Sequence, residues 1–163
     1  MRPASIQEIR NQLNQETPEA LIDLILRLAR FKQENKALIT YRLFDSINED
    51  AFVVSVQQLI REVFVGVNPA PYLAKKTIRK AIRIGNQAIK YSGVPTTEIS
   101  ILLCLLCEME QAPVNISSSP VLVNLAKGLF KRAKKCHDAL HEDLQFEYRT
   151  KIKDISNWLE EMD

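Results

Sequence analysis

The sequence predicts an all-α fold of antiparallel helical hairpins in a solenoid-like (HEAT-like) array. Two observations lead to this expectation. Apolar residues recur at spacings of three and four along nearly the whole chain, and only 4 of the 163 residues are glycine, where average usage would give roughly 11. The glycines are too scattered for a phosphate-binding loop or a nucleophile elbow. An irregular helical bundle is the alternative, because no internal repeat is recognisable.

Caps, prolines and glycines indicate where the helices begin and end. Ser5 and Glu8 have the spacing of a capping box. Thr17 precedes Pro18, which is typical of a cap followed by a proline at the first helical position. Gly93, with a proline just beyond it, is typical of a helix C-terminus. The helices predicted from these signals and from the apolar spacing span residues 6–13, 18–32, 36–47, 51–65, 72–91 and 97–111.

The C-terminal region carries one apolar stripe from residue 121 to residue 159. Ser119 followed by Pro120 again indicates a helix cap with a proline at the first helical position. No proline or glycine follows Gly128. This pattern predicts either one long helix or a pair of helices over residues 120–162, with a break near residues 137–143 in the second case. A chain of this length is expected to form a single all-helical domain over residues 1–163.

Compartment and membrane association follow from three further features. The most apolar stretch, residues 99–107, is about half as long as a membrane crossing requires. Residues 1–10 lack the apolar segment of a secretory signal. Cys104, Cys107 and Cys136 have no disulfide-framework spacing and are typical of reduced thiols. We therefore expect a cytoplasmic protein that does not bind a membrane.

Two segments carry a resemblance to a known family. Residues 28–44 read LARFKQENKALITYRLF and residues 72–83 read YLAKKTIRKAIR. Together they resemble an uncharacterised family of all-helical bacterial proteins. The resemblance implies no activity, cofactor or site residue, and it favours an interaction module over an enzyme.

Charge is distributed unevenly along the chain, although the total is only +2. Residues 67–137 hold eleven basic and three acidic residues, whereas residues 138–163 hold three basic and eight acidic ones. At 100° per residue, the cations of each basic segment fall on one arc of about 140° to 160°, opposite the apolar residues. The candidate binding residues are Lys75, Lys76, Arg79, Lys80, Arg83, Lys90, Lys127, Lys131, Arg132, Lys134 and Lys135.

If the two basic segments lie in one layer, these cations form a single surface that attracts an anionic macromolecule. We favour an acidic protein over nucleic acid, because only 7% of the residues are aromatic and no base-stacking platform is evident. Non-specific binding to a phosphate backbone is the alternative. Two other interpretations of the basic surface are open. It could be a solvated face without a partner, or it could pair with the acidic tail of the same chain. The acids of that tail include Asp138, Glu142, Asp143, Glu147 and Asp154.

His137 and His141 are four residues apart, which predicts two imidazoles on one helix face, as in zinc-binding helices of the HExxH type. Asp138 stands where that motif has its catalytic glutamate, and no third ligand is identifiable. A metal-dependent enzyme that uses both histidines is therefore only the remaining alternative. We expect a non-enzymatic protein with no catalytic residue, metal or cofactor, and a partly buried or surface histidine pair.

Other chemically suggestive spacings have structural explanations. Cys104 and Cys107 have the C-x-x-C spacing in the middle of an apolar helix, so we expect buried side chains and no redox site. Glu108 and Glu110 are two residues apart on the same helix and cannot face each other as an acid/base pair. Trp158 is expected to anchor the last helix to the core.

Overall fold

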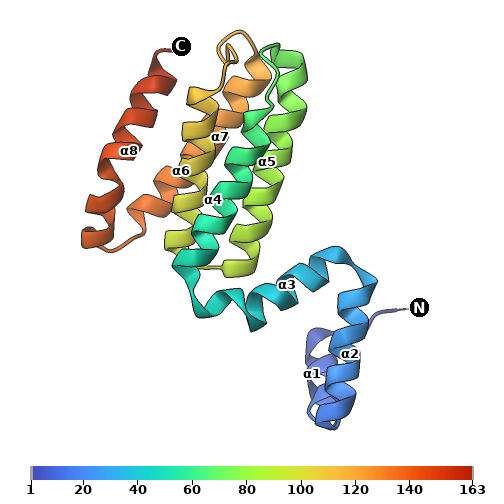
Figure 1. The fold of residues 1–163 in the computed structure, drawn as a ribbon. Helices are drawn as coiled ribbons and strands as arrows, with labels where there is room; N and C mark the ends of the chain where they lie inside the picture. The colour runs from blue at the N-terminus through green and yellow to red at the C-terminus, as the bar shows by residue number, and fades with distance from the viewer. Residues whose placement is uncertain (1, 163) are drawn as a thin grey trace. The chain divides into compact units, whose positions relative to one another are not determined.

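A computed structural model describes residues 2–162, and this part of the chain is all-helical, as predicted (Figure 1). It contains eight α-helices, α1 to α8, one short 3-10 helix, η1, and no strand. Backbone contacts divide the chain into an N-terminal unit, residues 1–44, and a C-terminal unit, residues 45–163. This division does not test whether residues 1–163 fold as one domain, so the single domain stays a prediction.

The N-terminal unit begins with the predicted cap. Ser5 and Glu8 form a reciprocal capping box at the start of α1, in which the Ser5 amide donates to the Glu8 carboxylate at 2.7 Å. Thr17 Oγ1 accepts from the amide of Ala20 at 3.2 Å and caps α2, with Pro18 at the first position. The helices of this unit are α1 (Ile6–Leu13), α2 (Pro18–Phe31) and α3 (Gln33–Leu43).

The third helix differs from the prediction of 36–47. It begins earlier, at Gln33, because the backbone is extended only at Lys32 (φ −145°, ψ 140°) and turns helical again at once. The Asn35 side chain secures this corner by donating to the carbonyl of Leu28 at 2.9 Å. The helix also ends earlier, at Leu43, and residues Asp45–Ile47 form η1, which belongs to the C-terminal unit.

The C-terminal unit is built around α6. Its helices are α4 (Glu49–Val65), α5 (Pro71–Ser92), α6 (Pro95–Gln111), α7 (Pro120–Asp138) and α8 (Glu142–Glu160). Helix α6 packs against each of the other four (Figure 1). Nine of its 17 residues are buried, which agrees with its being the most apolar segment of the sequence.

Helices α5 and α6 approach closely at Gly85. A Cβ atom at this position would lie 2.9 Å from Leu105 Cδ1 and 3.0 Å from Ile101 Cγ2. A side chain there would therefore overpack the interface between the two helices. At the end of α5, Gly93 adopts a left-handed φ of 68° and its amide donates to Ile89 at 2.9 Å, which confirms the predicted stop.

The C-terminal stripe forms two helices, because α7 ends at Asp138 and α8 begins at Glu142. The Gln145 side chain donates to the carbonyl of Leu140 at 2.8 Å, so an acceptor released by the break is satisfied. Ile155 and Leu159 are buried, and Trp158 is half-buried and packs against the same core.

One buried polar cluster has no counterpart in the sequence-based predictions. Thr97, expected at the start of a helix, lies inside α6 and is buried. Its hydroxyl donates to Glu49 Oε1 at 2.5 Å, and Ser92 donates to the same carboxylate oxygen. These bonds join the first turn of α4 to the end of α5 and the start of α6.

Candidate functional site

The basic face of α5 lies opposite its buried face. Ala74, Ile78, Ala81, Gly85 and Ala88 face the core of the C-terminal unit. The six α5 cations fall on the other side of the helix; five of them are exposed and Lys75 is half-buried. The segregation predicted from the sequence is therefore present on the folded helix.

The α5 cations have no internal partners in residues 2–162. Ion pairs in this part of the chain include those of Arg61 with Glu108, of Arg132 with Glu98, and of each histidine with a nearby aspartate. Within these residues, no hydrogen bond or ion pair involves the side chains of Lys75, Lys76, Arg79, Lys80, Arg83 or Lys90.

Helix α7 presents its cations less uniformly. Leu122, Ala126, Leu129 and Ala133 are buried, and the exposed Lys131, Lys134 and Lys135 lie on the opposite side of the helix. Lys127 is half-buried.

Arg132 differs from the other candidate residues because it holds helices together. Its Nη2 atom lies 3.1 Å from Glu98 Oε1 of α6, and its Nη1 atom donates to Asn86 Oδ1 of α5 at 2.7 Å. The guanidinium thus bridges α5, α6 and α7 through Nη1 and Nη2, and its side chain is still 43% exposed. The same bonds show that α5 and α7 approach each other at this point.

The acidic tail does not pair with the basic face of α5 in the described residues. Asp138 binds His137, with Oδ1 and Nδ1 3.0 Å apart, and Asp143 lies 3.3 Å from His141 Nδ1. Within residues 2–162, no ion pair joins an acid of the tail to an α5 cation.

The prediction that both histidines lie on one helix face is wrong. Helix α7 ends at Asp138, so His141 falls in the following turn and caps α8, where its Nδ1 atom accepts from the Asp143 amide at 3.4 Å. His137 Nε2 lies 3.1 Å from the carbonyl oxygen of Gln145. In the part of the chain that the structure describes, no group of three or more His, Cys, Asp or Glu side chains could hold a metal ion.

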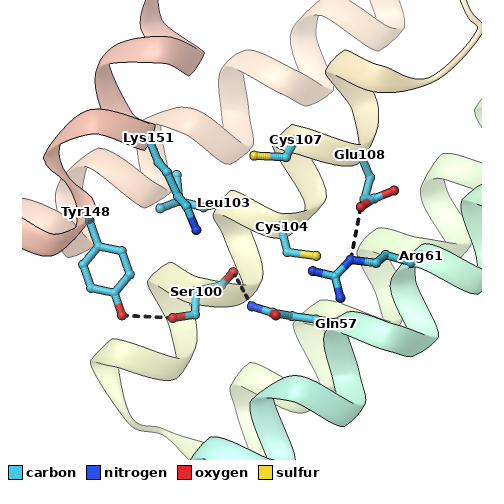
Figure 2. Close-up of a pocket in the computed structure, with 9 residues that line it drawn as sticks. All are labelled: Gln57, Arg61, Ser100, Leu103, Cys104, Cys107, Glu108, Tyr148 and Lys151. Carbon is cyan, nitrogen blue, oxygen red and sulfur yellow. Dashed lines mark hydrogen bonds and ion pairs between the residues drawn. The ribbon is translucent and has the colours of Figure 1, made fainter.

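A small pocket of about 120 Å³ lies on α6 between α4 and α8 (Figure 2). Arg61 of α4 enters it from one side, with Nε 3.5 Å from Glu108 Oε1, and Lys151 of α8 enters from the other. Ser100 and Tyr148 share a hydrogen bond of 3.0 Å at its edge. Sequence reasoning missed this pocket, because its lining comes from three helices that are distant in sequence.

Cys104 and Cys107 line this pocket. Cys104 is buried, as expected, and Cys107 is half-buried. Burial raises the pKa of Cys104 to about 11 and also raises the pKa of Cys107. Both thiols therefore stay protonated at neutral pH, which leaves them poor nucleophiles.

The two glutamates that follow Cys107 have different environments. Glu108 faces Arg61 in the pocket, whereas Glu110 is exposed. The pKa of Glu110 is raised by partial burial and by the nearby charges of Asp154 and Glu161. The two carboxylates do not act on a common site.

None of the described helices is long and apolar enough to span a membrane. Comparisons with protein-family models, curated proteins and solved structures find no match to this chain. The resemblance to a family of all-helical bacterial proteins stays a prediction.

Proposed function

We propose that this protein is a non-enzymatic helical interaction module whose basic surface binds an anionic protein. The observation that supports this most directly is the set of six α5 cations without an internal partner in residues 2–162. A purely basic helix face creates a positive potential that speeds and orients the approach of an acidic surface. Lys131, Lys134 and Lys135 of α7 extend the surface, and Arg132 contributes by holding α5 beside α7.

Apolar side chains at the beginning of the basic face favour a protein partner. Tyr72 is 83% exposed and lies within the basic arc, and Leu73 is 52% exposed at its edge. Protein interfaces combine exposed aromatic and aliphatic anchors with surrounding charge. Nucleic-acid binding to single strands would instead require several aromatic side chains along the basic groove.

The proposal includes the finer expectations drawn from the sequence. These are an arrangement of antiparallel hairpins in a solenoid-like array that presents α5 and α7 together, a cytoplasmic location, and kinship with the all-helical bacterial family. In such arrays, neighbouring helices on one layer form an extended binding face.

The test measures binding of a fluorescent polyglutamate peptide by anisotropy over a range of salt concentrations. The triple variant Arg79→Glu, Lys80→Glu, Lys131→Glu should bind at least tenfold more weakly than the wild type, and the wild-type affinity should fall as salt rises. The matched control is Lys32→Glu with Lys36→Glu and Lys153→Glu, which reverses three exposed cations outside the surface. This control should retain most of the affinity.

A second probe separates protein from nucleic acid. Labelled duplex DNA is measured under the same conditions as the peptide. Tighter binding of DNA than of the acidic peptide would overturn the proposal in favour of a phosphate-backbone binder. Equal affinities of the triple variant and the wild type for polyglutamate would overturn the role of the basic surface itself.

A further inference from the structure

Helix α2 is strongly apolar and yet has no buried residue. Its large apolar side chains cover an arc of about 220° at 100° per residue, which in soluble proteins is typical of a helix enclosed by neighbours. The polar arc contains only its four charged residues, Glu19, Asp23, Arg27 and Arg30.

The N-terminal unit does not supply the missing neighbours. In its described residues, 2–44, Tyr41 alone is buried. On one side of α2, Ala20 and Leu24 line a cavity of about 450 Å³ that is shared with α1. Helix α3 also packs against α2, but the side chains of Ile22, Ile25 and Leu26 on the opposite side stay exposed. The unit, residues 1–44, is close to the size of about 40 residues below which a disulfide, a metal or association with another chain is usually needed.

The uncovered side carries a regular stripe. Ile22, Ile25, Leu26 and Ala29 have the spacing i, i+3, i+4, i+7 and lie within an arc of about 100°. Ile22 is 57% exposed, Ile25 45% and Leu26 46%. This is the pattern with which one helix packs along another.

The charges beside the stripe are arranged with opposite signs at the two ends of the helix. Glu19 and Arg30 lie on the same edge of the stripe, just beyond Leu26. They are 11 positions apart, or about 16 Å along the helix, which is too far for an internal ion pair. Neither side chain makes a hydrogen bond or ion pair with another residue in 2–162.

We propose that α2 pairs antiparallel with α2 of a second copy of this chain, along the stripe Ile22, Ile25, Leu26 and Ala29. A two-fold axis near the middle of the stripe, between Ile25 and Leu26, brings Glu19 to within two positions, or about 3 Å along the helix, of Arg30 of the second copy, and the reverse pair is generated by symmetry. The same register sets Ile22 opposite the small Ala29 and Ile25 opposite Leu26. In a parallel pair the edge that carries Glu19 and Arg30 would instead face the opposite edge of the stripe, which carries Leu21 and Leu28, so neither charge would meet an opposite one. This inference is independent of the basic surface.

The experiment measures the mass of the full chain by sedimentation velocity. The wild type should be a dimer. Glu19→Lys and Arg30→Glu should each raise the dimer dissociation constant at least tenfold, because each variant turns two attractive pairs into repulsive ones. An equimolar mixture of the two variants should recover the dimer. In the mixed dimer the lysine introduced by the first substitution faces the glutamate introduced by the second, while the other pair keeps its native residues.

Two further variants keep the result interpretable. Arg27→Glu changes the same charge on the same helix but points about 100° away from the stripe edge, and it should leave the dimer unchanged. Ile25→Asp should abolish the dimer. The proposal is overturned by a monomeric wild type, which would assign the stripe to another covering surface. It is also overturned by a dimer that resists Ile25→Asp, or by a mixture of charge variants that stays monomeric.

Discussion

Helices α2 and α6 are both strongly apolar, but the structure places them in opposite environments. Helix α6 has four helical neighbours and buries nine of its 17 residues. Helix α2 has 14 residues and buries none of them. Apolar periodicity therefore indicates that a helix packs against apolar neighbours. It does not indicate which segment, or which chain, supplies these neighbours. In the C-terminal unit the partners are within the unit, whereas in the N-terminal unit we infer a second copy.

The two units should consequently derive their stability from different sources. Burial in the C-terminal unit depends on contacts within one chain, so its unfolding should be independent of protein concentration. The N-terminal unit should gain stability as concentration rises, because dimerisation is a mass-action effect. Substitutions in α6 and in α2 test whether the stability of the two units depends on protein concentration in these different ways.

The largest expected effect is that of Leu105→Ala in α6. Leu105 is fully buried, and its truncation should lower the free energy of unfolding by about 3 kcal/mol through lost burial and a cavity. The fluorescence of Trp158, the only tryptophan, reports denaturant unfolding of the C-terminal unit. Ile25→Ala is the matched substitution in α2 and should leave this transition in place while weakening the dimer.

The two helices would not differ as described if Leu105→Ala and Ile25→Ala lowered the free energy of unfolding, followed by Trp158 fluorescence, by the same amount. Such a result would mean that the stripe of α2 stabilises the C-terminal unit directly. It would also remove the premise of the dimer.

A smaller effect is expected from alkaline pH. The pKa of Cys104 is raised by burial to about 11, so the folded chain keeps a proton that the unfolded chain releases above about pH 9. The stabilisation of the folded chain that results from this pKa difference is fully present below the ordinary thiol pKa of 9.0. It is lost as the pH rises from that value through the pKa of the folded state. The whole shift corresponds to roughly 3 kcal/mol, of which roughly 2 kcal/mol is lost by pH 10.5. Only the C-terminal unit contains cysteine.

The measurement compares denaturant unfolding of the wild type and Cys104→Ala at pH 8 and at pH 10.5. The wild type should lose more stability over this interval than the variant, because other alkaline titrations are common to both. If the wild type and Cys104→Ala lost the same free energy of unfolding between pH 8 and pH 10.5, burial would not raise the pKa of Cys104.

The smallest effect concerns two glycines inside helices. Gly128 of α7 has open space where a Cβ would lie, so Gly128→Ala should raise the free energy of unfolding by about 0.5 to 1 kcal/mol through helix propensity. Gly85→Ala gains the same propensity but brings its Cβ against Leu105 and Ile101. It should lower stability by about 1 kcal/mol.

Thermal or denaturant unfolding of the two variants tests how tightly the C-terminal unit is packed. A stabilising Gly85→Ala would show that α5 and α6 can separate slightly at no cost. The packing around α6 would then differ less from the packing around the exposed α2 than the burial of their side chains suggests.

Most helix bounds could be predicted from the sequence, because caps and stops act within one turn. The Ser5 and Glu8 box and the left-handed Gly93 are formed by residues close in sequence. The break between α2 and α3 was placed a few residues too late, since Lys32 has no strong signal for an extended backbone. The two histidines were assigned to one helix for a similar reason. Alanine and leucine continue the helical pattern through residues 139 and 140, where the helix has in fact ended.

The basic face of α5 could also be predicted, because the angular position of a side chain on a helix depends only on sequence spacing. The role of Arg132 could not. Its partners Asn86 and Glu98 lie 46 and 34 positions away, and nothing in its own segment distinguishes it from Lys131. The pocket between α4 and α8 was unpredictable for the same reason.

Local sequence is enough to specify which residues become helical and which sides of each helix are apolar or charged, since both follow from interactions between residues a few positions apart. The tertiary structure decided which apolar faces find a neighbour. It enclosed α6, left the stripe of α2 uncovered within its unit, and gathered Ser92 and Thr97 around the carboxylate of Glu49. These outcomes depend on contacts between distant segments, whose geometry arises only when the helices pack together.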